Sequence, residues 1–324
     1  MNKKAYLLVN FGGPRERGEI EEFLIELLTD QEVIRTPFPA WFHRLLFKRI
    51  AKKRSEKVAQ DYDLIGGCSP IFKDTEELAK KVAEKLGQEV ITFHRYLPKT
   101  HKAFIEKIQT LNAEEIVVVP LFPQFSYATT GSIALWFTQQ LPPSTTKKMH
   151  WFRDYGSHPP YIEVMQNTLR DFLHQHQLQE ENICLLFSAH GLPQEFIDTG
   201  DSYQKECESS FKAIRKDFPN AVSLISYQSQ FGKKPWILPY TSTVCNAIES
   251  HTQGRKQVVI IPLSFTSDHI ETLYEVEHTY MTVIREKGLE AHRCPALNLR
   301  EDWIQVVADL FQHQRLEKTS LLLR

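Results

Sequence analysis

The feature that most constrains the fold is that two segments of the first half recur, in similar form, in the second half of the chain. We call each such pair of similar segments an echo. The segment LLVNFGGP at residues 7–14 resembles LLFSAHGLP at 185–193, and IVVVPLFPQFS at 116–126 resembles VVIIPLSFTSD at 258–268. Similar segments that recur in the same order are the signature of a duplicated structural unit. The sequence therefore predicts two copies of one kind of domain, and its 324 residues are enough for each to bury a core of its own.

Each echoed segment contains a short apolar run that ends at Gly or Pro, which is typical of a buried strand. Strands are predicted at 5–11, 89–94, 116–122, 149–152, 183–188, 221–226 and 257–262, and helices at 19–29, 73–86, 100–110, 160–176, 201–215, 240–251, 268–287 and 301–316. Strands that alternate with helices form parallel sheets covered on both faces. The fold class is therefore α/β.

The two halves differ in length, which indicates an insertion. The echo positions Leu8 and Val119 are 111 residues apart, whereas Leu186 and Ile261 are 75 apart, so the first half carries about 36 more residues. The predicted boundaries are 1–148 for the first domain, about 30–66 for its insertion and 149–324 for the second domain, whose last helix can pack back on the first.

The insertion contains the segment RTPFPAWFHRLLFKRIAKKR at residues 35–54, which mixes aromatic, aliphatic and basic side chains. Such a segment suits a membrane surface, with its aromatic rings in the interface and its cations on anionic lipid. It equally suits a cover over a large flat apolar ligand. The alternative is a helix that packs on the core and has a solvated basic end.

Charge and cysteine content exclude several classes. Lys and Arg number 39 against 40 Asp and Glu, so a nucleic-acid partner is not expected. The five cysteines show no CxxC spacing, which indicates a reducing, cytoplasmic location rather than a disulfide framework. No apolar stretch approaches the roughly 20 residues that span a bilayer, and the N-terminal apolar run is too short for a signal peptide.

Residues able to do chemistry follow two of the predicted strands. Asp268, Glu271 and Glu275 have the spacing of one helical face just beyond strand 257–262, and His190 follows strand 183–188. Because functional loops gather at the carboxyl edge of a parallel sheet, these side chains are expected to flank one cleft. A neutral imidazole accepts a proton or binds a metal, and nearby carboxylates take the proton or hold a cation. The alternatives are a solvated acidic first turn and a hydrogen-bonded loop histidine.

Three other strand ends carry candidate binding residues. Arg95 and Tyr96 in FHRYLP suit a ligand carboxylate, with a surface ion pair as the alternative. The segment PQFSYATTGS at 123–132 is small and rich in hydroxyl groups, so a flat ligand can approach its backbone. The segment YQSQFGKKPWILP at 227–239 is either a binding loop or a turn anchored by one large aromatic ring.

Taken together, these segments resemble the ferrochelatases, enzymes that insert ferrous iron into a porphyrin at the last step of haem formation. The resemblance rests on seven segments in the family's order, namely LLVNFGGP, IGGCSPI, FHRYLP, PQFSYATTGS, SAHGLP, YQSQFGKKPW and PLSFTSDHIETLYE. It implies two similar Rossmann-like domains with parallel sheets, the class II chelatase fold, with the porphyrin cleft between them. It also implies that the apolar segment forms a lip of that cleft.

The resemblance also implies roles for individual residues. His190 and Glu271 are expected to be catalytic, and the same two residues with Asp268 and Glu275 are expected to contact the metal. Porphyrin contacts are expected from Phe11, Arg35, Arg95, Tyr96, Ser126, Tyr127, Gln228, Ser229, Trp236 and His269. Metal insertion needs a base for the two pyrrole N–H protons and ligands that hold iron while it loses water.

Departures from the family pattern refine the expected substrate. Phe11 stands where some members have Tyr, which accompanies coproporphyrin, so protoporphyrin IX is the expected porphyrin. Asp63 and Leu64 stand where animal members are basic, so propionate binding is expected to rest on Arg35 or Arg95. The sequence has no cysteine after Cys294, so neither the two-iron, two-sulfur cluster of animal members nor any other prosthetic group is expected.

The expected protein is thus a bacterial-like, cytoplasmic ferrochelatase that associates with the inner membrane through residues 35–54. One alternative is a chelatase for coproporphyrin or a more polar tetrapyrrole, which the apolar lip disfavours. The other is a porphyrin or haem carrier without catalysis. Such a carrier needs an axial ligand but no base opposite a line of acids, so His190 and Glu271 together favour the enzyme.

Overall fold

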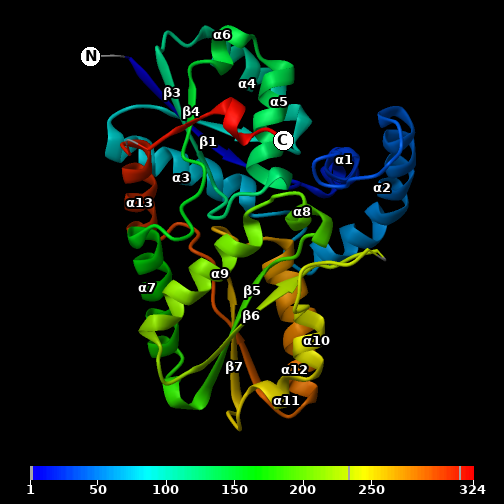
Figure 1. Ribbon diagram of the computed structural model, residues 1–324, viewed down its shortest axis with the longest axis vertical. Coiled ribbons are helices and arrows are strands. Elements are labelled where there is room, and N and C mark those ends of the chain that lie inside the picture. The colour runs from blue at the N-terminus through cyan, green and yellow to red at the C-terminus, as the bar shows by residue number, and fades with distance from the viewer. Residues whose placement is uncertain (1–2, 233, 314) are drawn as a thin grey trace. The chain divides into compact units, whose positions relative to one another are not determined.

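A computed structural model describes residues 3–232, 234–313 and 315–324 (Figure 1). The chain forms two compact units, and the first is assembled from both ends of the chain. Unit 1 comprises Met1–Asp154 and Leu299–Arg324, and unit 2 comprises Tyr155–Asn298. Each has a sheet of its own, as expected for a duplicated domain.

The sheet of unit 1 has the strand order β2-β1-β3-β4-β9. These strands are β1 (Lys4–Asn10), β2 (Val90–His94), β3 (Glu115–Pro120), β4 (Met149–Trp151) and β9 (Glu317–Lys318), of which only β9 is antiparallel to its neighbour. Its α-helices are α1 (Ile20–Thr29), α2 (Ala40–Asp63), α3 (Ile71–Leu86), α4 (Pro98–Thr110), α5 (Ser132–Gln140), α6 (Pro143–Thr146) and α13 (Glu301–Phe311). A π-helical turn, η2 (Tyr127–Gly131), precedes α5, and short 3-10 turns lie at η1 (Arg17–Glu19) and η6 (Thr319–Leu322).

The sheet of unit 2 is entirely parallel and has the order β6-β5-β7-β8. Its strands are β5 (Ile183–His190), β6 (Val222–Gln228), β7 (Gln257–Pro262) and β8 (Glu290–Arg293). Its helices are α7 (Pro159–Gln175), η3 (Glu180–Asn182), α8 (Gln194–Asp198), α9 (Tyr203–Ile214), η4 (Arg215–Asp217), α10 (Thr241–Asn246), α11 (Ile248–His251), η5 (Glu271–Tyr280) and α12 (Met281–Glu286).

The strand orders show that the two units share one topology. The order β2-β1-β3-β4 corresponds strand for strand to β6-β5-β7-β8, and the echoed segments form β1 with β5 and β3 with β7. Their central strands are buried except at one end, because helices cover both faces of a parallel sheet. The fold is the predicted α/β fold with two similar parallel-sheet domains.

Residues 149–152 were predicted as a strand of the second domain, but the structure places β4 in the first sheet. Met149 and Trp151 pair with Ile116 and Val118 of β3, and the Trp151 side chain is fully buried in that core. Unit 1 therefore ends at Asp154, later than the predicted residue 148. The last helix, α13, packs against α3 and belongs to unit 1.

The helix predicted at 268–287 is not one regular α-helix. It begins as the π-helix η5, in which the N–H of Met281 bonds to the carbonyl of Val276, five residues earlier, and it continues as α12. Apolar periodicity does not separate these two helix types, because both bury one stripe of side chains. The predicted insertion contains α2, which packs against α1.

Candidate active site

His190 is the last residue of β5, at the carboxyl edge of the unit 2 sheet. The parallel register places it beside Gln228, the last residue of β6. Its backbone N–H donates to the Ser264 hydroxyl, in the segment after β7, at 3.0 Å. Its side chain remains partly exposed, while the rest of β5 is buried. The strand thus presents one imidazole at the sheet edge on a rigid support.

Glu271 is the partner of this imidazole. His190 Nδ1 and Glu271 Oε2 lie 2.8 Å apart. Burial alone lowers the pKa of His190, but the Glu271 carboxylate outweighs it, so that pKa lies above its usual value. Burial likewise raises the pKa of the Glu271 carboxyl, yet the charge and hydrogen bond of His190 hold it well below its usual range. The two side chains form a charge-assisted pair.

The π-helix η5 brings Glu275 next to Glu271. In a π-helix each turn takes in more residues than an α-helical turn, so side chains four positions apart come close to alignment. Glu275 accepts a hydrogen bond from the Tyr280 hydroxyl at 2.6 Å. Burial, followed by the Glu271 charge, raises the pKa of Glu275. Two neighbouring carboxylates thus differ in proton affinity.

Gln228 and Ser229 turn toward these carboxylates. The Ser229 hydroxyl lies 2.9 Å from Glu271 Oε2 and 2.5 Å from Glu275 Oε2, and the Gln228 amide lies 3.3 and 3.4 Å from the same two atoms. Gln228 is almost wholly buried, and its carbonyl oxygen accepts a hydrogen bond from Ser188, which fixes the amide orientation. Gln228 and Ser229, two of the four predicted porphyrin contacts in unit 2, are thus engaged with the acids.

Asp268 lies outside this group, contrary to the single acidic face expected from the sequence. It precedes η5, and its carboxylate binds the Arg293 guanidinium at 2.7 Å and the side chains of Asn298 and Thr272 at 2.8 Å. The i, i+3, i+7 spacing assumed an α-helix from residue 268 onward, but the helix begins at Glu271. Among the described residues, no three His, Cys, Asp or Glu side chains are arranged to hold a metal ion.

Two further predicted porphyrin contacts line unit 2 near these residues. His269 is buried, and its Nδ1 lies 3.2 Å from the carbonyl of Ser267. Burial lowers the pKa of His269, so this imidazole favours the neutral form. Trp236 is buried against Gly191, where a side chain would collide with the Gln228 carbonyl 2.7 Å away. Gly191 therefore permits Trp236 to pack beside the end of β5.

In unit 1, the predicted contacts Arg95 and Tyr96 meet at a buried acid. Asp30 Oδ2 accepts hydrogen bonds from Arg95 at 2.7 Å, Tyr96 at 2.9 Å and Ser132 at 2.5 Å. The Tyr96 side chain is fully buried. The guanidinium that was expected to bind a propionate thus has an internal partner. Asp30 was not predicted, because an isolated polar residue at a helix end carries no sequence signal. Ser132 ends the hydroxyl-rich segment 123–132 but was not predicted as an individual contact.

The remaining predicted contacts of unit 1 lie in varied surroundings. The Phe11 ring is partly exposed and packs edge-on against Tyr96, with ring centres 4.5 Å apart. Arg35 is partly buried, and its charge acts on the Glu32 carboxyl. Ser126 is buried and caps η2 by accepting from the Ala128 N–H, and Tyr127 is partly buried against Phe125.

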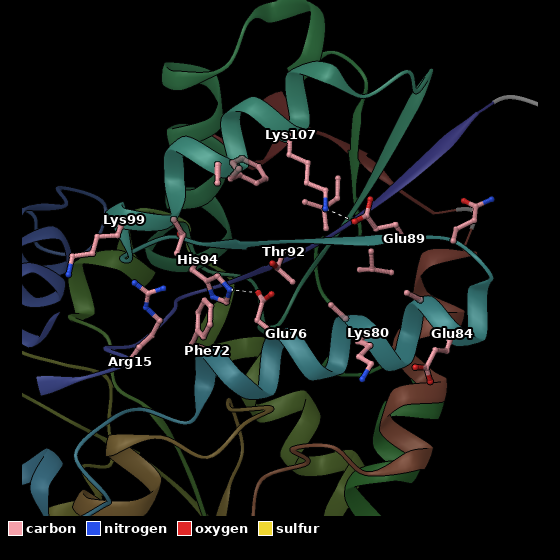
Figure 2. A pocket seen from close by; sticks show the side chains of 18 of the residues that line it. Arg15, Phe72, Glu76, Lys80, Glu84, Glu89, Thr92, His94, Lys99 and Lys107 are labelled. Carbon is pink, nitrogen blue, oxygen red and sulfur yellow. Dashed lines mark hydrogen bonds and ion pairs between the residues drawn. The ribbon is translucent and has the colours of Figure 1, made fainter. Parts of the chain in front are cut away.

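A cavity of about 910 Å³ lies elsewhere in unit 1, between α3 and α4 over the open edge of β2. Figure 2 shows Glu76 directed at His94, and Lys107 at Glu89, pairs that lie 2.9 and 2.5 Å apart. The residues that line this cavity include none of the predicted site residues. A smaller cavity of about 380 Å³ borders the Asp30 cluster and is lined by Arg95 and Ser132.

The apolar lip is exposed on α2 and the segment before it. Trp41 is 71% exposed, and its neighbours Phe38, Phe42 and Leu45 are between 38% and 49% exposed. The rings of Phe38 and Trp41 both pack edge-on against Phe42. Within the described part of the chain, no helix is both long and apolar enough to cross a membrane.

Comparisons with known proteins decide the family. The ferrochelatase family model matches residues 3–315. The chain belongs to the ferrochelatase family. It is 44% identical to the ferrochelatase of Chlamydia abortus and 45% identical to that of Chlamydia caviae, each over 319 residues and 98% of both chains. This ferrochelatase family member is therefore a lyase that inserts metal into a porphyrin in haem biosynthesis, with a porphyrin and ferrous iron as substrates.

Solved chelatases share the fold of this ferrochelatase family member. SirB from Bacillus subtilis aligns with a TM-score of 0.55 and 13% identity over 96% of this chain and 94% of its own. CbiX, the terminal enzyme of siroheme biosynthesis in denitrifying bacteria, aligns with a TM-score of 0.54 and 12% identity over 95% and 98%. At such low identity the likeness shows the class II chelatase fold alone.

Proposed function

We propose that this chelatase inserts ferrous iron into protoporphyrin IX and that His190 and Glu271 are its catalytic pair. The observation that carries the proposal is the 2.8 Å contact between His190 Nδ1 and Glu271 Oε2 at the carboxyl edge of the unit 2 sheet. A pair of this kind, on a rigid strand and a helix, supplies a base whose orientation is fixed before the substrate arrives.

The pair suits removal of the pyrrole protons. When Nδ1–H of a neutral imidazole donates to Glu271, the Nε2 lone pair of His190 is the proton acceptor. The ionised Glu271 then stabilises the imidazolium that forms. Iron is the second substrate. We assign its transient ligands to Glu271, Glu275 and, before it accepts a proton, His190; these side chains would have to rearrange around the ion, because they do not form a metal site as they stand. Asp268 is not in this set, because Arg293, Asn298 and Thr272 occupy its carboxylate.

Two features support protoporphyrin and a membrane surface as the source of substrate. Phe11 adds an apolar ring where a coproporphyrin enzyme of the family has a hydroxyl, and the exposed lip of Trp41, Phe42 and Leu45 matches an apolar ligand. Aromatic side chains of this kind sit at lipid interfaces, with basic residues nearby on anionic headgroups. We propose a cytoplasmic enzyme that associates peripherally with a membrane and carries no prosthetic group or iron–sulfur cluster.

The test is an anaerobic assay in which the purified protein and ferrous iron are offered protoporphyrin and coproporphyrin in parallel. We expect a higher kcat/KM for protoporphyrin. His190→Ala should abolish insertion and leave porphyrin affinity, measured by fluorescence quenching, within a few-fold. Preference for coproporphyrin would overturn the substrate assignment, and unchanged turnover of His190→Ala would remove His190 from the mechanism.

A further inference from the structure

Ser229 has an unusual backbone conformation at the end of β6. Its φ is +64°, in the left-handed region that non-glycine residues rarely adopt. A residue held in such a conformation at a functional site is evidence of a constraint on where its groups point. Here the backbone conformation directs both the N–H and the hydroxyl of Ser229 toward the acids of η5.

The contacts of Ser229 are short and reach both acids. Its N–H donates to Glu275 Oε1 at 3.0 Å, and its hydroxyl lies 2.5 Å from Glu275 Oε2 and 2.9 Å from Glu271 Oε2. The Gln228 amide reaches the same oxygens at 3.3 and 3.4 Å, which is weaker geometry. Ser229 therefore makes the shortest side-chain link between the two acids.

The arrangement also gives the two acids different hydrogen-bond partners. Glu275 is held by the Tyr280 hydroxyl at 2.6 Å and by two groups of Ser229. Glu271 makes the contact with His190 Nδ1. Two like-charged carboxylates beside one imidazole would otherwise compete for it, because either would gain from the pairing.

We propose that Ser229 is a positioning residue, not a porphyrin contact: it holds Glu275 toward Tyr280 and aligns Glu271 on His190. The inference rests on the proposed catalytic roles of His190 and Glu271. Truncating the hydroxyl leaves the acids free to change rotamer. The consequence is a loss of turnover without a loss of porphyrin affinity.

The test compares three substitutions at this position. Ser229→Gly removes the hydroxyl and suits the left-handed backbone, so the variant should fold at least as well as the parent. Ser229→Ala removes the hydroxyl and keeps the β-carbon. Ser229→Asn restores a donor in a residue that tolerates this conformation. We expect Gly and Ala to lower kcat about tenfold to a hundredfold and to leave KM for porphyrin within about twofold.

A rescue and two comparisons sharpen the result. Ser229→Asn should recover several-fold of the kcat lost in Ser229→Gly, which a purely structural role would not give. Tyr280→Phe removes the other hydroxyl on Glu275 and should lower kcat less, also at constant KM. Gln253→Gly is the matched control, because Gln253 also has a positive φ, of +50°, in a turn outside the site. Its kcat and KM should be those of the parent.

Each contrary result has a distinct meaning. A raised KM with an unchanged kcat would make Ser229 a porphyrin contact and overturn the inference, as would parental kinetics of Ser229→Gly. An Asn variant no better than Gly would also overturn it, because the donor would then be irrelevant. His190→Ala is measured in parallel. If that variant stays active, the proposed catalytic pair fails, whereas an inactive His190→Ala beside a fully active Ser229→Gly defeats only the role of Ser229.

Discussion

At the scale of single residues, the chemistry of this protein depends on which partner each charged side chain has. Glu271 is paired with His190, whereas Asp268 is paired with Arg293 and Asp30 with Arg95. All three acids lie near the carboxyl edge of a sheet, where functional residues are expected from the sequence. Only the first has a partner with a second nitrogen that can accept a proton, because an imidazole has such a nitrogen and a guanidinium is a donor only. Partner choice therefore separates the acid proposed as catalytic from the two acids that are paired with guanidinium groups.

The His190–Glu271 pair should show in the titration of the imidazole. Glu271→Gln removes the charge that raises the pKa of His190, so that pKa should fall. A raised folded-state pKa contributes stability that is complete below the unfolded value of about 6.5 and is lost as pH rises through the folded value. NMR titration of the imidazole reads the shift.

The free energy of unfolding of Glu271→Gln should depend on pH in the same direction. The deficit of Glu271→Gln in free energy of unfolding should be larger at pH 6 than at pH 8.5, as measured by urea denaturation. The lowered pKa of Glu271 gives no opposing change over this interval, because that carboxyl titrates below it. An equal deficit at both pH values would contradict the assigned coupling.

Asp30 should matter for stability more than for chemistry. Its carboxylate accepts three hydrogen bonds, and its side chain is 6% exposed beside that of Arg95 at 11%. Asp30→Ala leaves a buried guanidinium without this partner, which typically costs about 3 to 5 kcal/mol. Urea unfolding should show a loss of this size. Asp154→Ala, on a more exposed ion pair with Arg153, is the control and should change stability by less than about 1 kcal/mol.

At the scale of elements, η5 and α2 are the two that depart from a plain Rossmann-like unit. Glu271 and Glu275 lie one turn apart on the π-helix, which follows β7 after residues 263–270, and both acids contact the end of β6. The echoed segment after β3 forms the π-helical turn η2 in the same position. The helix α2 instead has no counterpart among the described residues of unit 2, and it exposes Trp41, Phe42 and Leu45.

The exposed face of α2 should govern delivery of an apolar substrate. Replacing Trp41, Phe42 and Leu45 together by Ser should weaken co-sedimentation with anionic liposomes and raise the apparent KM for protoporphyrin several-fold. Because these side chains are already exposed, the melting temperature should change little. Leu321→Ser, at a residue 64% exposed outside the lip, is the control. If lipid binding and KM both stay unchanged, the side chains of the lip serve only in packing.

At the scale of the whole molecule, the echoes and the strand–helix alternation were enough to predict two similar parallel sheets. The sequence also placed His190 and the acids beyond β7 at one edge of the second sheet, and the resemblance to ferrochelatases singled out Glu271 as the partner of His190, a contact that the structure contains. Other features depend on contacts that sequence does not display. The exclusion of Asp268 requires Arg293, which is 25 residues away, and β4 joins the first sheet through the burial of Trp151.

Short polar segments were also beyond prediction. The strand β8, EAHR, and the two-residue β9 have no apolar alternation, because each is an edge or near-edge strand held by backbone pairing. The helix α5 begins within a hydroxyl-rich segment whose composition is typical of a loop. The π-helix was also not predicted, because its buried residues Thr272, Val276 and Tyr280 recur every four positions, a spacing that a short α-helix also accommodates.

The contribution of Leu299–Arg324 to unit 1 sets an order of events during synthesis. The ribosome completes every strand of unit 2 before it makes α13 and β9, which unit 1 requires for its core and its sheet edge. The part of the chain that is made first is therefore the last to be finished. Premature termination near residue 298 would harm the older half of the nascent protein, while leaving the younger half with all of its own segments.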